Sequence, residues 1–167
     1  KARLTILGSG TSQGVPMIAC DCHVCNSSDP HDKRLRSSAM VDMDGMRLII
    51  DAGPDFRTQM LREKVTHIDG ILLTHNHRDH TAGLDDIRAF NYFERRDSHI
   101  YCEPYVLDAL KMEYPYAFGE NKYPGSPEWR VHLIENEDSF RVSTHYGDPL
   151  LVWEQGHGYT NCKVASE

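Results

Sequence analysis

The stretch Leu73-Thr74-His75-Asn76-His77-Arg78-Asp79-His80 contains four side chains that can bind a metal ion, all within six residues. It overlaps the end of an apolar run, 70–74, that has the length of a buried strand. In extended backbone, residues two positions apart point to the same side, so His75 and His77 are predicted to bind one metal ion together. This spacing indicates a metal site at the end of a strand.

A second metal ion is expected beside Asp79 and His80, where the chain should turn towards a helix. Imidazoles and a carboxylate suit Zn²⁺, Mn²⁺ or Fe²⁺. Two such ions about 3.5–4 Å apart can bind the attacking and leaving oxygens of a displacement, with a hydroxide shared between them. The alternatives are a chance cluster of histidines on a solvated loop and a single structural metal. The spacing favours a two-metal hydrolase, in which Asp79 would orient the nucleophile and manage its proton.

The segment 75–80 resembles the H-x-H-x-D-H signature of the metallo-β-lactamase superfamily. Asp51-Ala52-Gly53, after an apolar run, resembles the Asp-x-Gly that precedes this signature. The segments 7–16 and 83–88 resemble the cyclic phosphodiesterase branch, which includes the phosphonate-pathway enzyme. The resemblance covers nearly the whole chain and is strongest up to about Arg88. It implies an α/β protein with an αββα sandwich and a dinuclear hydrolase acting on a small or cyclic phosphodiester.

The resemblance also implies ligands later in the chain. In the family the first metal ion takes a third histidine, and His157 is the candidate; an exposed loop histidine is the alternative, and His145 is a competing candidate. A complete superfamily domain continues with a bridging aspartate and a final histidine, whereas here no Asp follows Asp148 and no His follows His157. We therefore interpret 1–167 as one domain that forms the N-terminal two-thirds of a longer enzyme.

Asp51 and Arg88 are predicted to act beside the metal ligands. Asp51 is expected to accept hydrogen bonds from backbone or imidazole N–H groups of the metal loop, as carboxylates behind metal ligands commonly do; a simple turn aspartate is the alternative. Arg88 could bind a substrate phosphate through its bidentate guanidinium. Equally, it could pair with Asp85 or Asp86 and serve only packing.

A second cluster, Cys20-Asp21-Cys22-His23-Val24-Cys25, places three thiols within six residues. Thiolates this close are zinc ligands or redox partners. The acidic balance and the lack of a signal peptide predict a cytoplasmic protein, in which metal binding is expected rather than disulfides. The resemblance implies a structural zinc whose fourth ligand is a distant histidine. His23 and His31 are nearby but do not match that position, and three unligated cysteines are the alternative.

Composition limits the partners. The chain is 40% apolar and 26% charged, as ordinary globular domains are, and no apolar run approaches the length of a membrane span. The formal net charge of −7 argues against nucleic-acid binding through a basic face. Lys33, Arg34 and Arg36 could still steer a phosphodiester, although such clusters are usually solvated loops. We expect a small-molecule substrate, two divalent metals (Zn or Mn) and one structural Zn. An incompletely covered sheet would favour a homodimer.

Three other functions remain open. A tRNA 3′-processing endonuclease of the same superfamily would need an RNA-binding arm. A thioester or lactam hydrolase would use the same metals on a different substrate. A non-catalytic zinc-binding pseudo-enzyme would lack the later ligands.

Hydrophobic periodicity and turn residues predict the elements. The dipeptide Asp44-Gly45 between two apolar runs is a strong hairpin signal, and Pro54 and Pro104 can each open a helix. The expected strands are 4–7 (buried), 38–43, 46–50, 70–74, 130–134, 140–142 and 150–153, and the expected helices are 54–61, 81–90 and one from 104, followed by a loop over 119–127.

Overall fold

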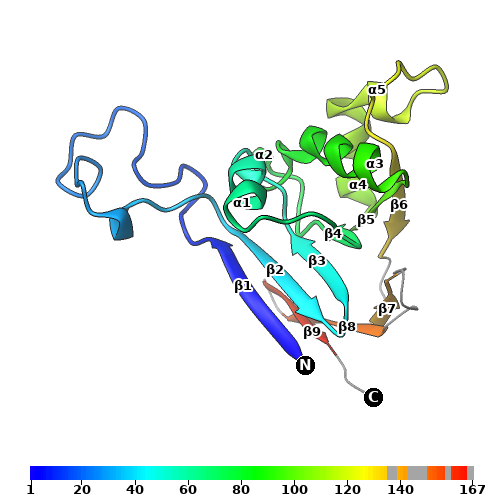
Figure 1. Cartoon of the computed structure of the whole chain (residues 1–167), viewed down its shortest axis with the longest axis horizontal. Helices are drawn as coiled ribbons and strands as arrows, with labels where there is room; N and C mark the ends of the chain where they lie inside the picture. Colours follow the sequence, from blue (N-terminus) through cyan, green and yellow to red (C-terminus); the bar gives the residue numbers. More distant parts are fainter. Residues whose placement is uncertain (135–138, 143–149, 157–158, 165–167) are drawn as a thin grey trace.

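The computed structural model describes residues 1–134, 139–142, 150–156 and 159–164, and within them the strands form two sheets (Figure 1). Six strands form the first sheet in the order β1-β2-β3-β4-β5-β6, antiparallel from β1 to β3 and parallel from β3 to β6. The second sheet is antiparallel, in the order β7-β8-β9. The strands are β1 (Ala2–Gly8), β2 (Ser38–Met43), β3 (Met46–Ile50), β4 (Gly70–Leu72), β5 (Ser98–Cys102), β6 (Trp129–Leu133), β7 (Ser139–Arg141), β8 (Leu150–Gly156) and β9 (Tyr159–Val164).

The hairpin prediction is confirmed. Asp44 and Gly45 have φ angles of +47° and +92°, the left-handed pair that a two-residue turn between twisted strands requires. The prediction that the first strand is buried is wrong, because Leu4 and Ile6 are 62% and 57% exposed while Leu7 is fully buried. β1 is one of the two edge strands of the six-stranded sheet, and its two faces have different environments. Strands β5 and β9 were not predicted.

One predicted helix is divided in the structure. A single helix over 81–90 was expected, but the chain forms α2, then a 3₁₀ turn η2, then α3. The interruption falls at Gly83, whose amide donates to the Ala52 carbonyl (2.8 Å). A Cβ at Gly83 would lie 2.1 Å from the Gly53 oxygen, so the chain bends there to pack against the end of β3. The helices are η1 (Pro30–Asp32), α1 (Phe56–Arg62), α2 (Arg78–Thr81), η2 (Leu84–Ile87), α3 (Arg88–Glu94), α4 (Pro104–Glu113) and α5 (Pro115–Phe118).

Apolar residues pack on both faces of the six-stranded sheet. The larger cluster joins sheet residues such as Ile49 and Ile71 to helix residues such as Phe56 and Leu110. The smaller cluster lies on the opposite face and includes Tyr101, only 1% exposed. The strands β3, β4 and β5 are parallel, so they end at the same edge of the sheet, beneath the loops that follow them. Open parallel sheets usually have their ligand-binding sites at this edge. No helix in the described ranges is long and apolar enough to cross a membrane.

Between β1 and β2 the chain projects as an arm, the blue loops at the left of Figure 1. The basic residues of this arm make contacts that hold it together. Lys33 Nζ donates to the Ser27 carbonyl (2.6 Å) and Arg34 donates to Ser9 Oγ (3.1 Å). Arg36 forms an ion pair with Asp55 (3.0 Å) and so anchors the arm to the start of α1.

Candidate metal centre

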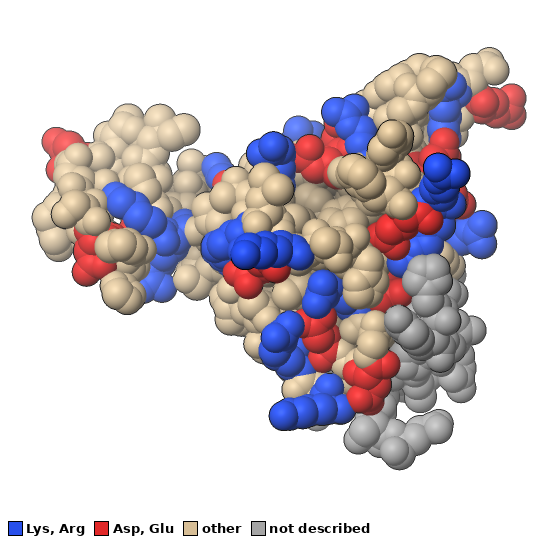
Figure 2. All heavy atoms as spheres, in the orientation of Figure 1, with Lys and Arg blue, Asp and Glu red and all other residues tan. Residues whose placement is uncertain are grey.

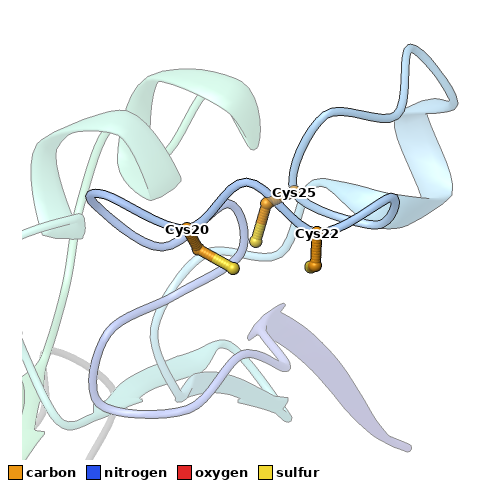
Figure 3. A group of neighbouring side chains, drawn as sticks. All are labelled: Cys20, Cys22 and Cys25. Atoms are coloured by element: carbon orange, nitrogen blue, oxygen red, sulfur yellow. The ribbon is translucent and has the colours of Figure 1, made fainter.

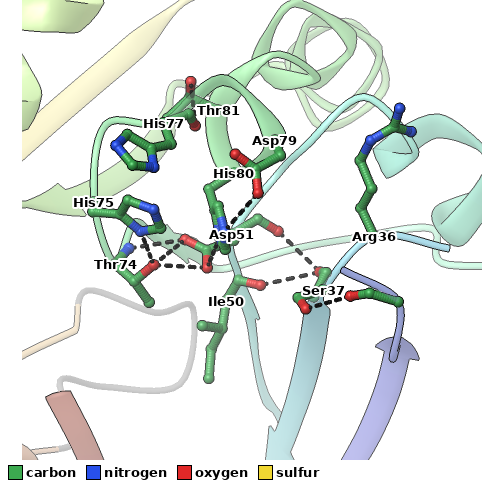
Figure 4. Close-up of polar contacts among 12 residues, drawn as sticks. Arg36, Ser37, Ile50, Asp51, Thr74, His75, His77, Asp79, His80 and Thr81 are labelled. Atoms are coloured by element: carbon green, nitrogen blue, oxygen red, sulfur yellow. Dashed lines mark hydrogen bonds and ion pairs between the residues drawn. The ribbon is translucent and has the colours of Figure 1, made fainter. Parts of the chain in front are cut away.

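The loop after β4 brings the predicted histidines together (Figure 4). The ring centroids of His75 and His77 are 4.6 Å apart, and those of His75 and His80 are 4.1 Å apart. Asp79 Oδ2 lies 3.1 Å from His80 Nε2. His77 has extended backbone (φ −69°, ψ 145°) immediately before α2, so the two halves of the motif are presented by a strand end and a helix start.

Asp51, at the end of β3, connects to both halves of this loop (Figure 4). Its carboxylate accepts hydrogen bonds from the Thr74 amide (2.8 Å) and the Thr74 hydroxyl (2.8 and 3.0 Å). It also lies 2.7 Å from Nδ1 of His80. Asp51 is 4% exposed and has φ +62°, an unusual backbone conformation for a residue with a Cβ. These contacts are those expected of a carboxylate that orients a metal-binding loop.

Close backbone contact joins the Asp51 turn to α2. The Ala52 amide donates to the His80 carbonyl (2.8 Å). A Cβ on Gly53 would lie 1.9 Å from the carbonyl oxygen of Asp79, so only glycine permits this approach. The glycine of the Asp-x-Gly segment therefore lets the carboxylate-bearing turn and the metal loop meet.

The pKa values of two histidines in the loop shift in opposite directions. Burial lowers the pKa of His75, with a further contribution from His80, and favours the neutral imidazole that metals bind. The hydrogen bond to Asp51 raises the pKa of His80. That bond occupies Nδ1 and leaves Nε2 facing Asp79. A metal-binding histidine commonly donates its other ring N–H to a carboxylate, as His80 can to Asp51. The donor set thus fits a divalent cation such as Zn²⁺ or Mn²⁺.

The three arm cysteines also converge (Figure 3). One ligand atom from each of Cys20, Cys22 and Cys25 lies within 4.8 Å of the others. Among the described residues, this is the one group of three or more potential metal ligands that lie so close together. The backbone N–H of Cys25 is the main reason that the pKa of Cys22 falls to about 7. His31, a nearby candidate for a fourth ligand, instead lies 2.8 Å from Asp29.

The remaining predicted site residues are Arg88, His157 and His145. Arg88 pairs with Asp85 (3.3 Å), so of the two roles considered the structure shows the ion pair. Tyr116 also donates its hydroxyl to Asp85 (2.8 Å). His157 and His145 lie outside the described residues.

Sequence reasoning missed residues that support the loop through hydroxyl groups. Thr74 donates to Asp51, and Thr81 donates to the His77 carbonyl (3.2 Å). The buried Tyr114 then donates to the Thr81 carbonyl (2.9 Å). Thr74 and Thr81 flank the predicted metal-binding segment, and this proximity could have identified them from the sequence. Tyr114 lies between α4 and α5, and no sequence signal connects it to the loop.

Comparisons with known proteins show the family and the fold. Residues 46–157 match the family model of the beta-lactamase superfamily domain. A curated octanoyltransferase from Porphyromonas gingivalis is 42% identical over 151 residues, which are 90% of this chain and 30% of that protein. The crystal structure of a diphosphatase from the PhnP family has a TM-score of 0.76 and 41% identity, covering 91% of this chain and 56% of that one.

A more distant structure shows the same fold. Zn²⁺-bound PqqB from Methylobacterium extorquens has a TM-score of 0.66 at 23% identity, covering 97% of this chain and 61% of that one. The chain therefore spans between 30% and 61% of the length of these three proteins.

Proposed function

Because the chain belongs to the metallo-β-lactamase superfamily, within its PhnP-like branch, we propose that its metal loop forms the active site of a phosphodiesterase with a dinuclear centre. The substrate class is a small or cyclic phosphodiester. The observation that carries the proposal is the Asp51–His80–Asp79 arrangement, in which a buried carboxylate fixes one imidazole nitrogen and leaves the other beside Asp79. This arrangement lies at the carboxyl ends of parallel strands, where substrates have access.

The proposed ligands divide between two ions. His75 and His77 would hold the first, together with His157 from beyond the described segment. Asp79 and His80 would hold the second. Zinc or manganese, when bound, would supply a nucleophile from water at neutral pH and neutralise charge on the phosphoryl oxygens.

The protein's own groups would then orient the reaction. Asp79, whose carboxylate is partly exposed at the site, would orient the attacking water and accept its proton. Asp51 would keep the His80 ring in register through its short hydrogen bond. Arg88 would bind a phosphate oxygen, for which it must leave its ion pair with Asp85; that pair is half-exposed and therefore weak.

We further propose that Cys20, Cys22 and Cys25 bind one structural zinc. The support is the convergence of their sulfur atoms and the lowered pKa of Cys22, which makes its thiolate available near neutral pH. A closed zinc site takes four ligands, so a further group is required. Such a site would fix the arm, which Arg36 joins to the body through its ion pair with Asp55.

The surface agrees with a small substrate. In Figure 2, lysine and arginine side chains are interspersed with aspartate and glutamate over the body of the molecule on the face shown. A continuous basic surface is what backbone contacts to nucleic acid require. A thioester hydrolase is the second candidate function, because the relative that is 42% identical is named an octanoyltransferase.

The test uses the full-length protein that contains these residues, gel-filtered without chelator. We expect two catalytic metals and one further zinc by elemental analysis, and hydrolysis of bis(p-nitrophenyl) phosphate. Asp79→Asn should lower that activity by about 10²–10⁴-fold, the usual contribution of a proton-transfer group. Asp97→Asn is the matched control, since Asp97 is a surface residue that pairs with Arg130.

The outcomes separate the candidates. Hydrolysis of an acyl thioester without phosphodiester hydrolysis would replace the first candidate by the second. Cleavage confined to tRNA 3′ ends would indicate the processing nuclease. Metal bound only by the cysteines, with no hydrolysis, would show a non-catalytic zinc protein.

A further inference from the structure

We propose that Ser38 is a positioning residue for the metal loop: its hydroxyl holds the backbone turn from which the Asp51 carboxylate reaches Thr74 and His80. Its catalytic meaning rests on the proposed function, while its structural part stands on the contacts alone. Ser38 is the first residue of β2 and lies opposite Gly8 of β1. It lies outside the metal-binding segment and outside the Asp-x-Gly segment.

The hydroxyl of Ser38 contacts two successive carbonyl groups. Its Oγ lies 3.0 Å from the Ile50 oxygen and 2.9 Å from the Asp51 oxygen. A serine hydroxyl has one hydrogen, so the two carbonyls share it in a three-centre bond. Ser38 is 8% exposed, and water therefore has little access to replace the hydroxyl.

This shared bond depends on the unusual conformation of Asp51. In a regular strand, successive carbonyls point in opposite directions. Here the φ of +62° at Asp51 turns its carbonyl towards the same donor that serves Ile50. The left-handed conformation is disfavoured for residues with a Cβ, so the turn needs outside support. Ser38 supplies that support from the neighbouring strand.

The position of the turn affects the loop because the Asp51 carboxylate contacts the loop. Once the turn is set, the Asp51 carboxylate lies 2.8 Å from the Thr74 amide nitrogen and 2.7 Å from His80 Nδ1. Thr74 begins the loop and His80 lies in α2, so a rotation of the turn would disturb both halves of the candidate centre. The hydrogen bonds of the Ser38 hydroxyl go to the turn and not to a candidate ligand, which is why its role is positioning.

Amide hydrogen exchange on chelator-treated full-length protein tests the structural part. In Ser38→Ala, the Thr74 amide should exchange at least about tenfold faster than in the wild type, because its acceptor is no longer held. Ser38→Thr keeps the hydroxyl and should exchange at the wild-type rate. Ser98→Ala is the matched control: Ser98 is 7% exposed, and its hydroxyl accepts from Asn91 Nδ2 (2.9 Å), away from the loop.

Metal competition measures the functional part. Titration with Zn²⁺ against a chromogenic chelator should show about tenfold weaker binding to the loop in Ser38→Ala and no change in Ser98→Ala. Equal Thr74 exchange rates in Ser38→Ala and Ser98→Ala would overturn the proposal. If the wild-type loop binds no metal, the proposed function fails, and the exchange comparison still decides the role of Ser38.

Discussion

Replacing Gly53 by alanine should disturb the metal loop more than the fold. The added Cβ would lie 1.9 Å from the Asp79 carbonyl oxygen, whereas ordinary van der Waals contact begins at 3.4 Å. The two backbones must therefore separate by about 1.5 Å. That movement would break the bond from the Ala52 amide to the His80 carbonyl, now 2.8 Å. Asp51 would retreat from His80 together with the turn.

The expected size follows from these contacts. Overpacking of this kind usually costs about 1–3 kcal/mol of unfolding free energy. Displacing a carboxylate behind a metal ligand typically weakens metal binding by about 10–100-fold. A misplacement of about 1 Å can also lower a catalysed rate by about 10²-fold. Metal affinity should thus fall well beyond what the loss of stability alone would cause.

The assay pairs urea unfolding with Zn²⁺ competition for Gly53→Ala and Gly119→Ala. Gly119 is the control because its nearest neighbour, the Pro115 oxygen, would lie at 3.5 Å from a Cβ and its φ is an ordinary −69°. Wild-type Zn²⁺ affinity in a folded Gly53→Ala protein would refute the reasoning.

Three further predictions concern other parts of the molecule. Burial raises the pKa of Cys102 to about 12. Iodoacetamide at pH 8 should therefore leave Cys102 unmodified in metal-free native protein and should label the three arm cysteines. Early labelling of Cys102, detected by peptide mapping, would contradict its burial. Burial lowers the pKa of both His99 and His132 from 6.5, so the unfolded chain binds more protons and stability should fall as the pH drops below about 6.5. His132→Phe should reduce this pH dependence in urea unfolding, and an unchanged dependence would exclude the pair as its source. Tyr114→Phe removes a buried hydrogen bond of 2.9 Å and should lower the unfolding free energy by about 1 kcal/mol in urea unfolding. Equal stability would show that the bond contributes nothing.

Local patterns in the sequence predicted the elements that depend on neighbouring residues. Asp44-Gly45 specified its hairpin because only a few residue types adopt two successive left-handed conformations. Pro104 opened α4 as expected, since the first turn of a helix does not need its amide hydrogen. The prediction of one helix over 81–90 was wrong because the interruption at Gly83 depends on contact with the distant turn at Ala52 and Gly53. Helical periodicity along 81–90 contains no information about that contact.

The candidate site divides in the same way. The residue types and spacing of His75, His77, Asp79 and His80 predicted metal binding by themselves, because four potential donor groups within six residues can converge without help from the rest of the fold. Only the tertiary structure decided which groups hold those ligands in place. The parallel neighbours β3 and β4 bring the end of each strand together, and the Asp51 amide donates to the Leu72 carbonyl (2.9 Å).

The sequence by itself therefore identified the superfamily and predicted the metal-binding segment, because both depend on short, contiguous patterns. The tertiary structure decided that the Ser38 hydroxyl contacts the Asp51 carbonyl, that Gly53 must lack a side chain, and that Arg36 pairs with Asp55 at the start of α1. The physical reason is that hydrogen bonds and steric contacts act over a few ångströms, and the residues that make them here are up to tens of positions apart in the chain. Folding the sheet brings them within that range.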